Sequence, residues 1–144
     1  MSISLAEIHH PDEFTNRGLR AMARQSRKTG IITWYRVCCH GQEVAFLAVG
    51  RSGERLVPYQ LVVPRELRGR GIGSAILRAV EQLAQSDGYE RVRVWPRPLD
   101  DSFDQWGLER WYRERGYEVV TDGTGDMEKR LSWEPPEQAE GRAT

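Results

Sequence analysis

The chain has 144 residues, of which 39% are hydrophobic and 29% charged, and its 21 basic residues balance its 21 acidic residues. No apolar run approaches the roughly 20 residues that a membrane helix needs, so we exclude a membrane protein and expect one soluble domain. The zero net charge, and a basic first part without interleaved aromatic residues, disfavour a nucleic-acid-binding function. The first residues lack the pattern of a signal peptide, so we expect a cytoplasmic protein.

Four strands and one helix are predicted in the first half of the chain. Alternating polarity, β-branched residues and turn glycines predict strands over residues 3–8, 31–39, 43–49 and 54–63. A ragged apolar stripe predicts a helix over residues 12–28, between the first two strands. Pro58 lies in the fourth strand and cannot donate a ladder hydrogen bond, so we expect a β-bulge there if the strand is central.

The second half of the chain alternates helices and strands. The spacing of apolar residues predicts helices over residues 72–86 and 102–115 and strands over residues 90–95, 117–121 and 127–133. Ser102 and Gln105 form a capping box for the second of these helices. Residues 134–144 have no apolar face and are predicted to be a tail. The order β-α-β-β-β-α-β-α-β-β indicates a mixed α/β fold with both hairpins and crossovers.

The glycine-rich stretch R-G-R-G-I-G, residues 68–73, joins an apolar strand to a helix. Glycines allow a tight turn and a close ligand approach, and the free N–H groups and dipole of a helix start favour a phosphate. Arg68 and Arg70 add positive charge. A dinucleotide fingerprint would need GxGxxG and a P-loop GxxxxGK[ST], and neither pattern is present. The remaining alternative is a plain turn, which would not need three alternate glycines, so the stretch predicts a phosphate or pyrophosphate site.

Two motifs resemble those of the GCN5-related N-acetyltransferase (GNAT) family. Residues 68–73 resemble its [Q/R]-x-x-G-x-[G/A] loop, and W-Y-R-E-R-G-Y, residues 111–117, resembles its Y-x-x-x-G-[F/Y] segment. Gln105 lies seven residues before Tyr112, where many members carry Asn. The element order is similar as well. The resemblance implies a single N-acetyltransferase domain over residues 1–133, with a central mixed, mostly antiparallel sheet flanked by helices.

The resemblance also implies a function and a site. Acetyl-CoA would be the cosubstrate, and an amine would attack its thioester directly in a ternary complex, without a metal. The strand before the loop would pair with the pantetheine arm, and the loop would hold the pyrophosphate. Tyr112 would be the catalytic acid that protonates the leaving thiolate. The implied cosubstrate-binding residues are Leu61, Val62, Val63, Arg68, Gly69, Arg70, Gly71, Ile72, Gly73, Ser74 and Gln105.

The sequence departs from the family pattern in the expected general base. Several members carry a carboxylate on the strand before the glycine loop, but V-P-Y-Q, residues 57–60, has none, and Glu54 lies too near the turn. Tyr59 and Gln60 could orient the acceptor or a water instead. A base acting through water stays open, as do the side chains of Asp100, Asp101, His9, His10 and His40. The departure also leaves open a non-catalytic acyl-CoA-binding or protein-interaction module on the same fold.

The acceptor is predicted to be cationic, such as a polyamine, an aminoglycoside-like base or a protein amine. The acidic residues of the loop 96–105, together with Trp95 and Trp106, would suit a positive charge. Cys38 and Cys39 are adjacent in a strand and point to opposite faces, so we expect free thiols and no disulfide or metal site. Exposed strands and five tryptophans make a homodimer a further hypothesis.

Overall fold

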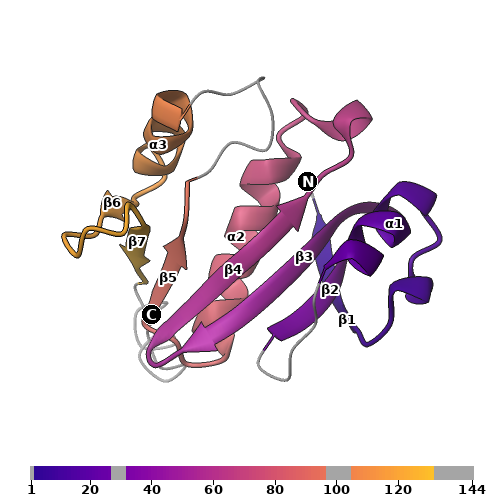
Figure 1. Cartoon of the computed structure of the whole chain (residues 1–144), viewed down its shortest axis with the longest axis horizontal. Coiled ribbons are helices and arrows are strands. Elements are labelled where there is room, and N and C mark those ends of the chain that lie inside the picture. Colours follow the sequence, from indigo (N-terminus) through magenta and orange to yellow (C-terminus); the bar gives the residue numbers. More distant parts are fainter. Residues whose placement is uncertain (1, 27–31, 97–104, 132–144) are drawn as a thin grey trace, which may run out of the picture.

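The computed structural model describes residues 2–26, 32–96 and 105–131, and these form one sheet with helices on both of its faces (Figure 1). The seven strands lie in the order β1-β2-β3-β4-β5-β7-β6, and only β4 and β5 are parallel neighbours. The strands are β1 (Ile3–Ile8), β2 (Ile32–Cys39), β3 (Gln42–Ser52), β4 (Arg55–Val62), β5 (Arg91–Val94), β6 (Glu118–Val119) and β7 (Met127–Arg130). The helices are η1 (Pro11–Glu13), α1 (Arg17–Gln25), η2 (Arg65–Leu67), α2 (Ile72–Ser86) and α3 (Gln105–Arg113). The mixed, mostly antiparallel fold is therefore confirmed.

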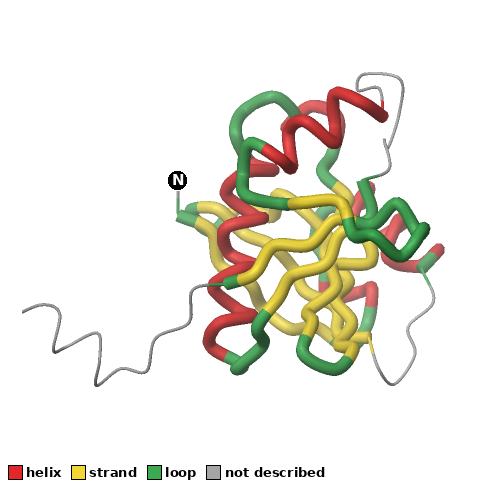
Figure 2. Tube along the Cα trace, turned by 90° about the vertical axis from the view of Figure 1, so that its left-hand side faces the viewer, coloured by secondary structure: helices red, strands yellow, loops and turns green. Residues whose placement is uncertain are grey.

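Strand β3 is buried on both faces because its side chains alternate between two apolar clusters. Leu47 and Val49 pack with α2, whose apolar residues recur at helical spacing. Phe46 and Ala48 pack on the opposite face with Leu19 of α1 and with other aromatic side chains. Figure 2 shows the resulting layers, with helices on either side of the strands.

The predicted helix over residues 12–28 is wrong in its first part. Residues 11–13 form the short helix η1, and α1 begins only at Arg17, with Asn16 as its N-cap. The buried carboxylate of Glu43, on β3, accepts the backbone N–H groups of Thr15 and Asn16 at 3.0 and 2.6 Å, so these residues approach β3 before the helix starts. The predicted end near Lys28 is also wrong, since α1 ends at Gln25.

The last two strands are shorter than predicted, because β6 covers only Glu118–Val119 and β7 covers Met127–Arg130. Part of the predicted capping box, Ser102, and all of the predicted tail lie outside the described residues. The bulge predicted from Pro58 is confirmed. The register between β3 and β4 shifts after the Ala48–Gln60 pair, so that Val49 opposes Pro58 and Tyr59 is the extra residue.

Strands β4 and β5 pair only at their first residues, Arg55 with Arg91 and Leu56 with Val92. Beyond this point the two strands separate (Figure 1). The bulge at Tyr59 lies in the separating part and bends β4 there. The backbone of β4 after Leu56 therefore has no strand partner on its β5 side among the described residues.

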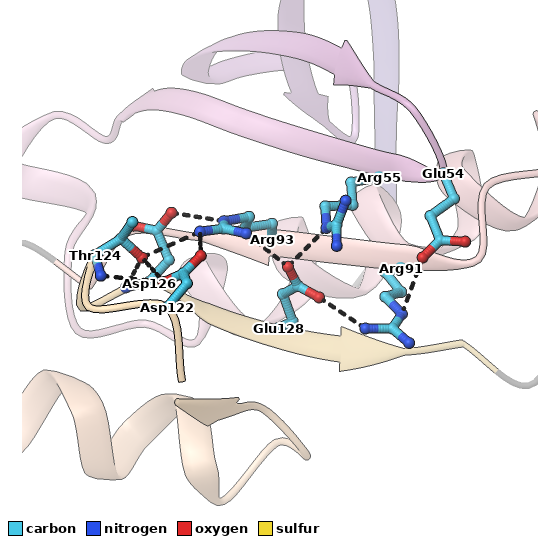
Figure 3. Close-up of polar contacts among 8 residues, drawn as sticks. All are labelled: Glu54, Arg55, Arg91, Arg93, Asp122, Thr124, Asp126 and Glu128. Carbon is cyan, nitrogen blue, oxygen red and sulfur yellow. Dashed lines mark hydrogen bonds and ion pairs between the residues drawn. The ribbon is translucent and has the colours of Figure 1, made fainter. Parts of the chain in front are cut away.

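An ionic network links residues of β4, β5 and β7 with residues of the turn before β7 (Figure 3). The half-buried Arg93 contacts three carboxylates, those of Asp122, Asp126 and Glu128, at 2.7, 2.6 and 3.0 Å. The buried Glu128 also accepts hydrogen bonds from Arg55 and from Arg91. Because Val92 and Val94 of β5 pack toward α2, the intervening arginines occupy the other face. Ion pairs thus join β4, β5 and β7 on one face of the sheet, and the apolar cluster around α2 joins them on the other.

Candidate active site

The conformation of the glycine-rich loop requires glycine at two of its three glycine positions. Gly69 and Gly71 both have φ +78°, which side chains other than glycine rarely adopt, and a Cβ at either position would meet nothing within 4 Å. Gly73 instead lies inside α2, where a Cβ would make an ordinary contact of 4.0 Å with the Trp111 ring. The predicted tight turn therefore belongs to Gly69 and Gly71.

Helix α2 begins at the loop without a side-chain cap. Gly71 is the N-cap, and the first helical hydrogen bond runs from the Ala75 N–H to the Gly71 carbonyl at 3.2 Å. Within the described residues, the N–H groups of Ile72, Gly73 and Ser74 have no intrahelical acceptor, as at any helix start. Three N–H donors and the positive end of the helix dipole thus lie together beside the loop, an arrangement that suits a phosphate.

The two predicted arginines of the loop differ in their contacts. Arg68 is half-buried, and its Nε donates to the Val63 carbonyl at 2.9 Å, which ties the loop to the end of the preceding strand. Arg70 is exposed and makes no hydrogen bond or ion pair with another described residue. Arg68 therefore shapes the loop, whereas the Arg70 charge is available to a ligand.

Tyr112 lies on α3 between two other aromatic rings. Its ring meets those of Trp111 and Tyr117 edge-on, with centroids 5.0 and 5.4 Å away. Its hydroxyl makes no hydrogen bond with another described residue. Burial disfavours the phenolate and raises the pKa of Tyr112, so the side chain is a protonated donor at neutral pH. The side chain of Gln105 lies outside the described part of the structure.

Arg115 is a residue of this site that the sequence did not reveal. Its guanidinium stacks over the Trp111 ring at 3.9 Å, and its Nη1 donates to the Trp111 carbonyl at 2.9 Å. Its Nη2 and Nε donate to the hydroxyl of Ser74, in the first turn of α2, at 2.8 and 3.2 Å. The i, i+4 spacing of Trp111 and Arg115 is a local signal for the stacking, but Ser74 is 41 residues away in the sequence.

Strand β4 offers no carboxylate next to the loop, as predicted. The Gln60 side-chain oxygen accepts a hydrogen bond from the Ser26 hydroxyl at 2.7 Å, and an amide cannot serve as a general base. Glu54 lies in the turn that precedes β4 and pairs with Arg91 at 3.5 Å. Asp100 and Asp101 lie outside the described residues.

The other candidate bases have structural roles or sit in turns. His10 caps η1, because its Nδ1 accepts the Asp12 N–H at 3.1 Å. His40 is exposed in the turn between β2 and β3, with φ +51°, and His9 is exposed after β1. Burial alone would raise the pKa of Glu43, but hydrogen bonds from Thr15 and Asn16 outweigh it and lower that pKa, which makes this carboxylate a poor base.

Three further observations concern metal ligands, thiols and membrane-spanning helices. In residues 2–26, 32–96 and 105–131, no three His, Cys, Asp or Glu side chains gather as metal ligands would. Cys38 and Cys39 are free and half-buried. None of the described helices is long and apolar enough to cross a membrane.

Structures of several acetyltransferases have a similar fold. The ribosomal-protein-S18-alanine N-acetyltransferase from Escherichia coli has a TM-score of 0.63 and 11% identity, covering 94% of this chain and 97% of its own. The PaiA N-acetyltransferase from Thermoplasma acidophilum, solved with coenzyme A, has a TM-score of 0.60 and 13% identity, covering 91% and 100%. A GNAT family acetyltransferase from Elizabethkingia anophelis, solved with acetyl-CoA, has a TM-score of 0.59 and 12% identity, covering 90% and 98%. No curated protein sequence matches the chain.

At these identities the structural likeness shows the fold. The sequence shows the family, because residues 29–119 match the model of the acetyltransferase (GNAT) domain. These residues make up more than half of the chain. The match includes β4, the glycine-rich loop, α2 and the helix that carries Tyr112. This chain therefore belongs to the GNAT acetyltransferase family.

Proposed function

We propose that this protein transfers an acetyl group from acetyl-CoA to an amine by direct attack in a ternary complex. The observation that carries the proposal is the separation of β4 from β5 beside the uncapped start of α2. The separation leaves backbone N–H and C=O groups of β4 without strand partners in the described part of the chain, and an extended ligand can pair with such a sheet edge. The amide-bearing pantetheine arm is such a partner along Leu61, Val62 and Val63.

The phosphates of coenzyme A would lie at the glycine-rich loop. The N–H groups of Ile72, Gly73 and Ser74 are the proposed donors, and the exposed Arg70 adds a positive charge. This placement runs the cosubstrate from the loop toward the divergent part of β4. The thioester then lies at the end of the sheet where α2 begins and where α3 lies (Figure 1).

The chemistry follows from this placement. The bound ammonium group first loses a proton to solvent. The amine nitrogen then attacks the thioester carbonyl, a C–N bond forms, the C–S bond breaks, and the nitrogen loses a second proton to solvent. A β4 N–H near Val62 polarises the carbonyl. Tyr112 donates a hydrogen bond to the leaving sulfur and supplies its proton, and its raised pKa keeps the hydroxyl protonated for this role. Gln105, on the same helix, is proposed as a further cosubstrate contact.

The acceptor is proposed to be a cationic amine. Two exposed aromatic side chains border the diverging strands, Tyr59 in the β4 bulge and Trp95 just after β5, with 57% and 61% of their surface exposed. Exposed aromatic faces bind ammonium groups through cation–π attraction. An amine with a pKa near ~10 is mostly protonated at neutral pH, so this surface would bind the charged form that is present in solution.

One observation favours a second candidate function, a module that binds acyl-CoA without turnover. The described part of β4 carries no carboxylate that could deprotonate the acceptor. An assay of thiol release from acetyl-CoA over a panel of polyamines, aminoglycosides and peptide amines separates the two. Amine-dependent release supports the transferase, whereas coenzyme A binding without release by any amine supports the module.

A further inference from the structure

We propose that Arg115 is a positioning residue for the diphosphate of coenzyme A, acting together with the hydroxyl of Ser74. This inference rests on the proposed function. Arg115 joins the end of α3 to the first turn of α2, where the phosphates are proposed to lie.

The Ser74 hydroxyl accepts hydrogen bonds from Arg115 and keeps its own proton free. A serine oxygen has two lone pairs and one hydrogen. Arg115 Nη2 and Nε donate to this oxygen at 2.8 and 3.2 Å, which occupies both lone pairs. The hydroxyl proton makes no hydrogen bond to another described residue. Arg115 thus leaves the Ser74 O–H as a free donor in the same helical turn as the free Ser74 N–H.

The positive charge of Arg115 has only one distant carboxylate beside it among the described residues. The carboxylate of Glu114 lies at the limit of an ion pair, 4.0 Å away, and the Glu114 side chain is 63% exposed. Arg93, by contrast, has three carboxylates within 2.6–3.0 Å. The Arg115 guanidinium is therefore weakly compensated, and its charge adds to the positive end of the α2 dipole. It uses three N–H groups in the contacts given above, and a guanidinium has five.

Arg115 is connected to Tyr112 through the Trp111 ring. The Arg115 guanidinium stacks on Trp111, and the Trp111 ring packs edge-on against that of Tyr112. An anion that fixes Arg115 therefore also fixes the part of α3 that carries the proposed acid. Arg115 therefore links the binding of the phosphates to the placement of Tyr112.

The experiment measures dissociation constants by calorimetry with coenzyme A, 3′-dephospho-coenzyme A and pantetheine. The variants are Arg115→Ala, Arg115→Lys and Ser74→Ala. Arg113→Ala is the matched control, because it removes an exposed charge at the end of α3, two residues before Arg115. We expect Arg115→Ala to weaken both nucleotide-bearing ligands about tenfold and to leave pantetheine within twofold. Ser74→Ala should weaken them severalfold, and Arg115→Lys should lie between Arg115→Ala and the wild type, since it keeps the charge without the fork. Arg113→Ala should bind like the wild type.

Several results would overturn the inference. Equal weakening of coenzyme A and pantetheine would make Arg115 a structural tie between α2 and α3. Loss confined to coenzyme A, with dephospho-coenzyme A unchanged, would move the contact to the 3′-phosphate. Unchanged binding in a folded Arg115→Ala or Arg115→Lys protein would remove the role. A wild-type protein that binds no coenzyme A would refute the proposed function itself, which separates that failure from the failure of Arg115.

Discussion

Replacing each of two neighbouring glycines by alanine tests whether the loop conformation or the lack of a side chain matters. Gly71 has φ +78° and Gly73 is helical, yet neither added Cβ would clash with another residue. The left-handed conformation costs roughly 1–2 kcal/mol for alanine. Gly71→Ala should therefore lower Tm by roughly 2–8 °C for a chain of this size. Gly73→Ala should leave stability unchanged or raise it by up to about 1 kcal/mol, because alanine favours the helix.

The same pair should separate in coenzyme A affinity. Relieving the strain at Gly71 rotates the peptide groups at the start of α2, so Gly71→Ala should lose one hydrogen bond to a charged phosphate, about 1.5–3 kcal/mol. This corresponds to a loss of affinity of roughly tenfold to a hundredfold. Gly73→Ala should bind within about twofold of the wild type, since its methyl faces Trp111. Thermal unfolding and calorimetry measure both effects, and equal behaviour of the two variants would refute this account of the loop.

Three further predictions concern the acid, the acceptor surface and the ionic network. Tyr112→Phe should lower kcat for acetyl transfer about a hundredfold and leave the Kd for coenzyme A unchanged. Because the pKa of Tyr112 is raised, the wild-type kcat should show no decrease from loss of the Tyr112 proton at any pH up to about 10. A pH-rate profile of both proteins checks this. In Gly50→Ala the new Cβ would lie too close to the Tyr59 ring, so the ring must move away. This variant should raise KM for the amine severalfold and leave KM for acetyl-CoA unchanged. Burial alone would raise the pKa of Glu128, but hydrogen bonds from Arg55 and Arg91 outweigh burial and lower that pKa. The ionised Glu128 therefore stabilises the fold at neutral pH. This contribution is lost as pH falls from about 4.5 through the lowered pKa. Glu128→Gln should cost about 3 kcal/mol at pH 7 in urea unfolding, and a constant difference down to pH 3 would contradict the assignment.

The parts of the fold that the sequence predicted well are those set by local spacing. Helix α2 has a regular apolar stripe, and the β4 bulge follows from a proline that cannot donate to its neighbour. The start of α1 could not be predicted, because it depends on the Glu43 carboxylate, 28 residues beyond Thr15. Local spacing carries no information about such a contact.

In the candidate site too, local motifs could be predicted from the sequence and long-range contacts could not. The motif around Gly69 and Gly71 predicted a turn that the φ angles confirm. The contact of Arg115 with Ser74 joins two helices 41 residues apart and has no sequence pattern of its own. The absence of a carboxylate from β4 was readable from the sequence. A base from elsewhere in the chain depends on tertiary placement, which a single sequence does not specify.

Amide chemical-shift mapping with acetyl-CoA tests the central claim most directly, and a 16.6 kDa chain is within reach of this measurement. The account predicts that the largest shifts fall on the amides of residues 61–63 and 69–74, with smaller changes around Tyr112. The amides of β1 and α1 should remain unchanged. Saturable shifts centred on α1 or on the network around Glu128, with the loop amides unaffected, would contradict the placement of acetyl-CoA between β4 and the start of α2.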